Sequence, residues 1–272
     1  SQARVFVHIE SHGDNLLNAA EIGATRIWGG TIKVDDNEQV TLTVTDTNGD
    51  KLVFNTFTLN NAYSITEDLS QLAEGKLLVT AEVTDNVGNY ATATDDAIKD
   101  TIASITLTID DGGDGWLNST EILSASAYGD ATGIEDGQIV TIIATDSAGN
   151  TAQITTTVSG GTFSVSGLDL SDFVDGVFTA TASVSDVAGN PASATDDVLI
   201  DTLANLSLNI ESNGDGVLNA VEVLTTKISG HASDVNDGAI VTITVEDNSG
   251  KSLTFTATVI NNEYVVLNAD LS

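Results

Sequence analysis

The chain repeats itself at an interval of 100 or 101 residues, and this period constrains its fold more than any other feature. The segment VFVHI at 5–9 aligns with ITLTI at 105–109 and with LSLNI at 206–210. Self-similarity at a fixed period marks an architecture built from repeated structural modules. We therefore expect three modules, and the third to lack its last two strands. The predicted domains are residues 1–100, 101–201 and 202–272.

Within the second copy, seven runs of alternating apolar and polar residues are separated by turn residues. The runs lie near 105–109, 122–129, 138–145, 151–158, 162–168, 177–185 and 191–199. Seven such runs in about 100 residues are typical of an immunoglobulin-like sandwich. The sequence has no Cys, so an antibody-type domain is excluded. We expect an all-β fold of tandem immunoglobulin-like Greek-key β-sandwiches arranged as a rod.

The charge of the chain limits its partners. It carries 40 acidic residues against 8 Lys and Arg, for a net charge of −32. Nucleic acid and anionic membrane surfaces would repel such a chain. Between Thr101 and Ala204 there is no Lys or Arg, so acids in that segment cannot form salt bridges there. Bound cations would neutralise them.

The sequence also indicates where the chain works. It contains no signal peptide and no apolar run long enough to span a bilayer, and it starts without Met, so we expect an internal piece of a longer protein. The absence of Cys, combined with the calcium loops described next, favours a disulfide-free protein that works outside the cell.

A twelve-residue acidic loop follows the first strand-like run of each repeat. Oxygen side chains stand at loop positions 1, 5, 9 and 12, and Gly or Asn stands at position 6, where a sharp turn requires positive φ. This is the ligand spacing of a calcium loop, in which the backbone carbonyl of position 7 also binds. The predicted ligands are Glu10, Asp14, Leu16, Asn18 and Glu21; Asp110, Asp114, Trp116, Asn118 and Glu121; and Glu211, Asn213, Asp215, Val217, Asn219 and Glu222.

Position 3 distinguishes the three loops. Asn213 supplies a usable oxygen there, whereas His12 and Gly112 are poor calcium ligands. The third loop is therefore the most complete. Alternatively, these Asp-Gly and Asp-Asn pairs mark solvated turns only. Three copies that retain the closing Glu favour calcium. No flanking helices are predicted, so the motif is an EF-hand-like loop and not a complete EF-hand.

Further acids are expected at the repeat junctions. Alternation of strands through the sandwich places the acidic loop at the end that meets the next repeat. Carboxylates that converge there would repel one another unless an ion bridged them. The linkers contribute Asp100 and Asp201, and the facing loops of the second repeat contribute Glu135, Asp136 and Asp186.

The last strand-like run of each complete repeat carries one more candidate ligand. Asp95 and Asp196 share a strand face with small apolar residues, which predicts that they are nearly buried. A buried charge is normally paired or bound to a metal. Asp95 and Asp196 are therefore predicted ligands outside the loop, whereas Asp96 and Asp197 face outward. The turns at Asp46, Asp146 and Asp247 are explained by Asp capping and a left-handed Gly.

Three motifs together resemble a known family. They are the strand followed by D-x-x-x-D-G-x-L-N-x-x-E, the V-x-D-x-x-G-N turn and the T-D-D-x-x-x-D-T linker. The chain resembles, over its whole length, the tandem bacterial immunoglobulin-like repeats of giant type I-secreted adhesins of the RTX and large non-fimbrial kinds. The resemblance implies a secreted protein of the bacterial cell surface, in which Ca²⁺ at the junctions stiffens an extender. Other domains would then bind host cells or abiotic surfaces, in adhesion, biofilm formation and virulence.

Two other classes of function were weighed. A module that binds a glycan or host protein directly would show non-repeating features concentrated in one copy, and Trp28, Trp116 and Lys33 are its candidates. An enzyme would need a constellation unique to one module, and neither a nucleophile elbow nor a phosphate loop is present. His8, His12 and His231 lack the spacing of a zinc site.

Overall fold

The computed structural model describes residues 2–272, and they form a β-protein. The only helical segments in this described range are three 3₁₀ turns of three residues each, η1 (Ile22–Ala24), η2 (Glu121–Leu123) and η3 (Glu222–Leu224). The prediction of an all-β fold is confirmed. No helix within residues 2–272 has the length and apolar character to cross a membrane.

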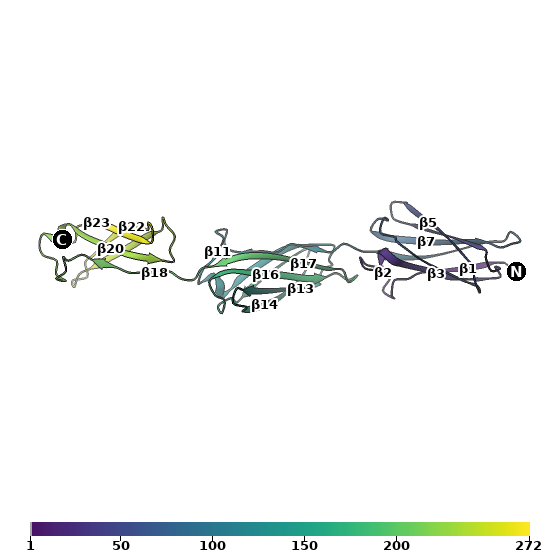
Figure 1. Cartoon of the computed structure of the whole chain (residues 1–272), viewed down its shortest axis with the longest axis horizontal. Helices are drawn as coiled ribbons and strands as arrows, with labels where there is room; N and C mark the ends of the chain where they lie inside the picture. The colour runs from purple at the N-terminus through teal and green to yellow at the C-terminus, as the bar shows by residue number, and fades with distance from the viewer. Residues whose placement is uncertain (1) are drawn as a thin grey trace. The chain divides into compact units, whose positions relative to one another are not determined.

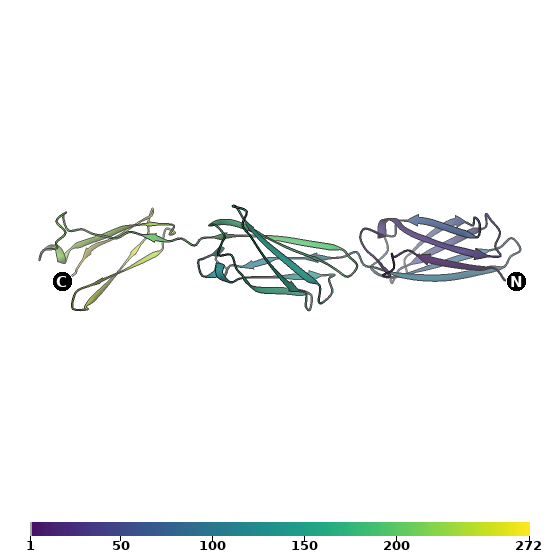
Figure 2. The same cartoon turned by 90° about the horizontal axis from the view of Figure 1, so that it is seen from below.

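The chain forms two compact units, Ser1–Ile200 and Asp201–Ser272. The first unit contains two similar sandwiches, and each packs two sheets face to face (Figures 1 and 2). In the first sandwich the sheets have the orders β1-β3-β6 and β2-β8-β7-β4-β5. Its strands are β1 (Arg4–Ile9), β2 (Leu16–Leu17), β3 (Thr25–Ile32), β4 (Gln39–Thr45), β5 (Lys51–Phe57), β6 (Ala62–Glu67), β7 (Gly75–Thr84) and β8 (Tyr90–Lys99).

The second sandwich repeats this order. One sheet runs β10-β12-β15, with β9 also paired to β12, and the other runs β11-β17-β16-β13-β14. Its strands are β9 (Ser104–Ile105), β10 (Thr108–Asp110), β11 (Trp116–Leu117), β12 (Ala125–Thr132), β13 (Ile139–Asp146), β14 (Thr151–Thr157), β15 (Thr162–Leu168), β16 (Gly176–Ser185) and β17 (Pro191–Ile200).

The second unit is described by itself. It has a sheet of β18, β19, β20 and β23, and a separate hairpin of β21 and β22. The bounds are β18 (Asn205–Leu206), β19 (Asn209–Ile210), β20 (Thr226–Ser233), β21 (Ile240–Glu246), β22 (Ser252–Thr258) and β23 (Glu263–Ala269). The boundaries predicted between the three repeats stay a prediction. Each of the three hydrophobic clusters nevertheless stays within one predicted repeat.

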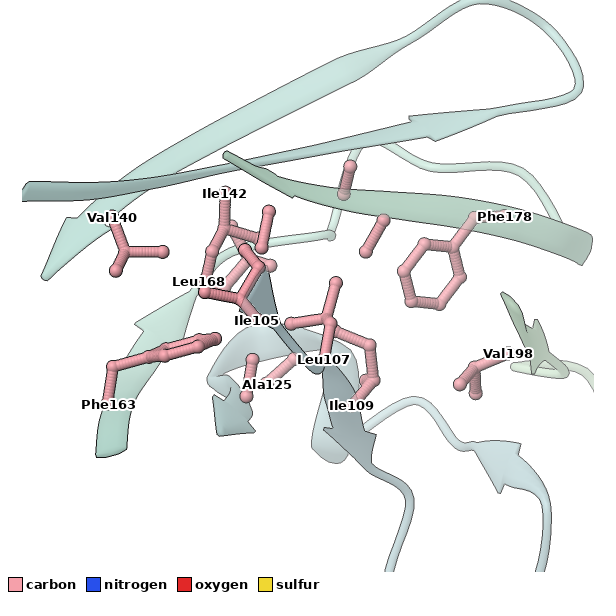
Figure 3. Close-up of a cluster of buried hydrophobic side chains, with 14 of the residues drawn as sticks. Ile105, Leu107, Ile109, Ala125, Val140, Ile142, Phe163, Leu168, Phe178 and Val198 are labelled. Carbon is pink, nitrogen blue, oxygen red and sulfur yellow. The ribbon is translucent and has the colours of Figure 1, made fainter. Parts of the chain in front are cut away.

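Alternation of side chains builds each core. In β1 every second residue is buried, so Val5, Val7 and Ile9 face the opposite sheet. In the second sandwich Ile142 and Phe178 come from one sheet and Ile109 and Phe163 from the other, and their side chains meet between the layers (Figure 3). Apolar burial of this kind provides the main stabilisation of the fold.

Some details of the strands differ from the expected runs. The fourth run of the second repeat forms β14 as expected, and it pairs with β13 in the larger sheet. The second run begins later than predicted, because residues 121–123 form the turn η2. The two-residue strands β2 and β11 were not predicted. They pair in parallel with the last strands β8 and β17, and so attach the acidic loops to the larger sheet.

A glycine in the third strand lets an aromatic ring cross the smaller sheet. A Cβ at Gly29 would lie 1.9 Å from the Phe6 carbonyl oxygen and 2.5 Å from the Tyr63 hydroxyl. Tyr63 uses this space to donate a hydrogen bond of 2.5 Å to that carbonyl, and burial raises the pKa of Tyr63. Gly230 and Tyr264 repeat the arrangement in the second unit.

We expect Gly29→Ala to destabilise the first sandwich by about 1–3 kcal/mol or more, because the added methyl overlaps backbone as well as ring atoms. Gly23→Ala is the control, since a Cβ there meets no atom within 4 Å and the backbone does not have positive φ. Hydrogen exchange of the β1 and β3 amides measures both variants. Equal protection in the two would show that the ring moves aside without cost.

Candidate metal loops and the repeat junction

The backbone of the acidic loop is left-handed at three positions in every repeat. Position 6 has φ of 67° at Asn15, 87° at Gly115 and 74° at Gly216, as predicted. Position 4 is a left-handed Gly in each copy. Position 3 also has positive φ, namely 53° at His12, 70° at Gly112 and 50° at Asn213. Asn and Gly tolerate this conformation well, so the choice of residue at position 3 follows from the backbone as well as from any ligand role.

The second half of the loop forms a capping box. Asn18 Oδ1 accepts from the amides of Ala20 and Glu21, and Glu21 Oε2 accepts from the amide of Asn18 at 3.1 Å. Such reciprocal bonds satisfy backbone donors at the start of a helical turn. The Asn118–Glu121 and Asn219–Glu222 pairs repeat the pattern before η2 and η3. Positions 9 and 12 therefore have a structural role independent of any metal.

The remaining acids of the loop also accept hydrogen bonds. At position 5 one oxygen of Asp14 accepts from the amide of Leu16 at 2.8 Å, and Asp114 and Asp215 do the same with Trp116 and Val217. At position 1 the copies differ. Asp110 accepts from Ser126 Oγ at 3.3 Å, and Glu211 forms an ion pair of 2.9 Å with Lys227. Glu10 lines a hollow with His12 and Glu21.

Positions 3 and 12 lie next to each other in all three loops. His12 Nδ1 is 2.9 Å from Glu21 Oε1, and Asn213 Nδ2 donates to Glu222 Oε1. A Cβ at Gly112 would be 3.7 Å from Glu121 Oε1. Carboxylate and amide oxygens suit calcium, so the third loop fits the ion in donor chemistry. Within residues 2–272, however, no three His, Asp or Glu side chains are gathered as a metal centre.

The carboxylates predicted on the last strands have partners in the opposite sheet. Asp95 Oδ2 accepts from the Ile9 amide at 3.0 Å, and Asp196 Oδ2 accepts from the Ile109 amide at 2.8 Å. Both carboxylates are half-buried and satisfy donors on the outer edge of the smaller sheet. Their position in a stripe of small residues is thus explained without a metal. Their role as ligands stays a prediction.

Within the first unit, the acidic loop of the first repeat contacts the turn between β16 and β17. Asn18 Nδ2 donates to the Ala188 carbonyl at 3.0 Å, and the Ala19 amide donates to Asn190 Oδ1 at 2.7 Å. Asn190 Nδ2 donates both to the Asp100 carbonyl in the linker and to Asp186 Oδ2. One buried amide therefore links the loop, the linker and the turn.

The equivalent turn of the first repeat shows what this contact changes. Asp186 and Asn190 are each 4% exposed, whereas Asn89, the counterpart of Asn190, is exposed. Asp85 and Asn89 make the same carboxylate–amide hydrogen bond. The hydrogen bond between Asp and Asn therefore forms in either turn. Contact with the neighbouring repeat is what buries the pair in the second repeat.

Acids converge on this junction as predicted for Asp100 and Asp186. Burial raises the pKa of Asp100, and the nearby carboxylates of Asp186, Glu135 and Glu74 raise it further. Glu135, also predicted there, accepts from the Val187 amide at 3.0 Å. Asp136 Oδ1 accepts from the Gly160 amide at 2.7 Å, and its role as a ligand stays a prediction. Asp201 begins the second unit, and its Oδ1 accepts from the Leu203 amide.

Glu74 and Asn190 were not among the predicted site residues. Glu74 accepts from both the amide and the hydroxyl of Thr101, and it lies 3.3 Å from the buried Lys99 Nζ. These bonds hold the start of the linker. The T-D-D-x-x-x-D-T motif contained Thr101, but nothing in its spacing indicated which side chain Thr101 would contact.

The chain is similar to several solved structures. One is a tetra-tandem repeat in the extending region of a large adhesion protein, at 28% identity and a TM-score of 0.39, covering 99% of this chain and 66% of that one. A second is a 1.5-MDa bacterial ice-binding adhesin, described for its host cell surface retention, at 25% identity and a TM-score of 0.42, covering 100% and 90%. A third is a Ca²⁺-stabilised adhesin of an Antarctic bacterium that reaches out and binds ice, at 26% identity and a TM-score of 0.42, covering 100% and 66%.

The first of these structures belongs to the extending region of a large adhesion protein, and the other two are bacterial adhesins. The chain spans just under two thirds of the first and third of them. No protein-family model and no curated protein matches the chain.

We expect Asn190→Ala to weaken the junction by about 1–3 kcal/mol, because it leaves the buried Asp186 carboxylate and the part-buried backbone groups of Ala19 and Asp100 without their partner. Asn89→Ala removes the same side chain from an exposed turn and should have a much smaller effect. Exchange of the Ala19 amide and proteolysis of the linker measure the difference. Equal behaviour of the two variants would show that Asn190 does not hold the repeats together.

The hairpin turns contain a separate, pH-sensitive carboxylate. Burial alone would raise the pKa of Asp146, but hydrogen bonds from Val174, Asn150 and Ala148 outweigh burial and lower the pKa to about 2. These bonds confirm the prediction that the turn aspartates cap their own backbone. Asp46 and Asp247 accept equivalent bonds.

Because the folded pKa of Asp146 lies below its ordinary value of 3.8, its contribution to stability is complete above that value and is lost as the pH falls towards 2. We expect Asp146→Asn to lower the protection of β13 amides at neutral pH and to flatten their loss of protection in acid. The exposed Asp130→Asn is the control. Hydrogen exchange at several pH values measures both, and an unchanged acid profile in Asp146→Asn would contradict the assignment.

Proposed function

We propose that this chain is an extender segment of a secreted bacterial surface adhesin, with a structural rather than an enzymatic role. The observation that carries the proposal is the junction in which Asn18, Ala19 and Asn190 join one repeat to the next through specific hydrogen bonds. Hydrogen bonds of this kind fix the orientation of one repeat relative to the next, so a chain of such repeats can hold a terminal domain at a distance. Other domains of the same protein would bind host cells or abiotic surfaces and so support adhesion and biofilm formation.

Calcium is the proposed stiffening ion. The junction gathers Asp100, Asp186 and Glu135, and burial together with repulsion from the nearby carboxylates raises the pKa of Asp100. A bound cation supplies positive charge and oxygen coordination that relieve such repulsion. Asp100 and Asp186 would hold it at the junction, and Asn213 with Glu222 would hold it in the third loop. The oxygens of the first two loops are proposed as weaker ligands.

The chain's own residues determine how such binding would act. Asn18 caps the loop through Oδ1 and reaches the next repeat through Nδ2, so the shape of the loop and the contact at the junction depend on the same side chain. An ion that binds the docked arrangement more tightly than the undocked one shifts the equilibrium towards docking. Motion between the repeats is then restricted.

We expect hydrogen exchange of the Ala19 amide to be slower in millimolar calcium than in chelator. Small-angle scattering should show a narrower range of particle dimensions in calcium. Asp100→Asn should stabilise the junction in chelator, because it removes a carboxylate from a repulsive group, and should reduce the response to calcium. Asp130→Asn, outside the junction, should respond as the original chain does. An identical calcium response in Asp100→Asn would exclude Asp100 as a ligand, and no response in any variant would exclude calcium stiffening.

A further inference from the structure

One surface of the first repeat departs from the repeating pattern. The outward side chains of β1, β3 and β6 include Phe6, His8, Arg26, Trp28 and Ser64, here called the β3 face. His8, Trp28 and Ser64 lie side by side in register across the three strands. All five residues are exposed. The face therefore combines aromatic and basic side chains on a strongly acidic chain.

Direct contacts order this face. The rings of His8 and Trp28 have centroids 4.8 Å apart, and Arg26 Cζ is 5.7 Å from the centroid of Trp28. Arg26 Nε donates to Ser64 Oγ at 3.0 Å. Asp95 lies 3.6 Å from His8 Nδ1. The guanidinium of Arg26 lies beside Trp28, where it can bind a ligand.

The same positions in the other repeats give a matched contrast. In the second repeat Ser126 and Tyr128 replace Arg26 and Trp28. In the second unit Lys227 occupies the position of Arg26, and it pairs with Glu211 at 2.9 Å. Glu10 is the counterpart of Glu211, yet within the described part of the chain Arg26 makes no ion pair and lies over Trp28 instead.

A hollow opens beside Trp28 at the edge of this face. Its lining includes Arg26, Trp28, Thr56, Phe57, Leu59 and Ser64. Phe57 and Leu59 are 58% and 63% exposed and both line this hollow beside Trp28. The lining thus presents an aromatic surface, a guanidinium and two hydroxyls at one place.

We propose that this hollow binds a saccharide that carries a carboxylate. The guanidinium of Arg26 suits a carboxylate, with which it forms paired charge-assisted hydrogen bonds. The rings of Trp28 and Phe57 suit the apolar face of a sugar ring, and Thr56 and Ser64 suit its hydroxyls. The equivalent hollow of the second unit has Ser229 in place of Trp28 and Glu263 in place of Ala62, so it would repel the same ligand.

Charge complementarity selects an anionic occupant over a neutral one. The net charge of −32 opposes any anion at long range, but physiological salt screens exposed charges beyond about 8 Å. At shorter range the ligand meets Arg26, whose other neighbours Glu10 and Glu21 line a separate hollow and not this one. This site is independent of the extender role and of calcium.

The test titrates the whole chain with tetragalacturonate and follows the β3 face by amide chemical shifts in chelator. The fully methyl-esterified tetramer has the same rings without charge and should bind at least about tenfold more weakly, since it loses the charge-assisted hydrogen bonds to Arg26. A tetraglutamate peptide tests whether any acidic chain suffices.

The variants use side chains that the other repeats already carry on the same framework. Arg26→Ser and Trp28→Ser take the residues of Ser126 and Ser229, and each should weaken binding of the acid tetramer at least about fivefold. Lys51→Thr takes the residue of Thr151 and removes one positive charge elsewhere, so it should leave binding unchanged. The proposal fails if the acid tetramer does not bind, if the ester or the peptide binds equally well, or if Lys51→Thr costs as much as Arg26→Ser.

Discussion

The hydrogen bonds of Asn190 are the interaction on which the arrangement of the first unit depends. A buried amide is costly unless its donors and acceptor are satisfied. Asn190 meets this requirement with groups from both repeats, since it bonds to Ala19 and Asp100 on one side and to Asp186 on the other. The docked arrangement is therefore defined by complementary polar groups as well as by burial. Ala188, whose carbonyl accepts from Asn18, is also buried at this contact.

Hydrogen bonding from the backbone also explains how a chain with few cations accommodates its acids. Asp46 and Asp146 accept amide hydrogen bonds within their own turns, and Asp95 and Asp196 accept them from the opposite sheet. The hydrogen bonds to Asp46 and Asp146 favour the charged form and lower the pKa of these two carboxyls. Asp100 is different, since burial and neighbouring carboxylates raise its pKa. Repulsion between carboxylates therefore acts at the junction.

The sequence predicted the parts of the structure that depend on periodic patterns. Alternation of apolar residues located most strands, and Asn15, Gly115 and Gly216 correctly marked a left-handed turn. The role of Asn18 and Glu21 was ambiguous, because the same oxygens serve a capping box or an ion. The contact of Asn190 was not predictable, because its motif is identical to the exposed turn at Asn89 and only docking distinguishes them.

Inward and outward positions on the third strand of each repeat have different roles, and this explains how similar repeats can differ in binding. The inward and cross-sheet contacts depend on Gly29, Gly129 and Gly230, where added side chains would overlap the neighbouring strand. The outward positions carry no such constraint, so Trp28 can stand where Tyr128 and Ser229 stand elsewhere. A change on this face costs little stability because it leaves the core unchanged. A repeated framework can therefore carry a single binding surface without any change to its junctions.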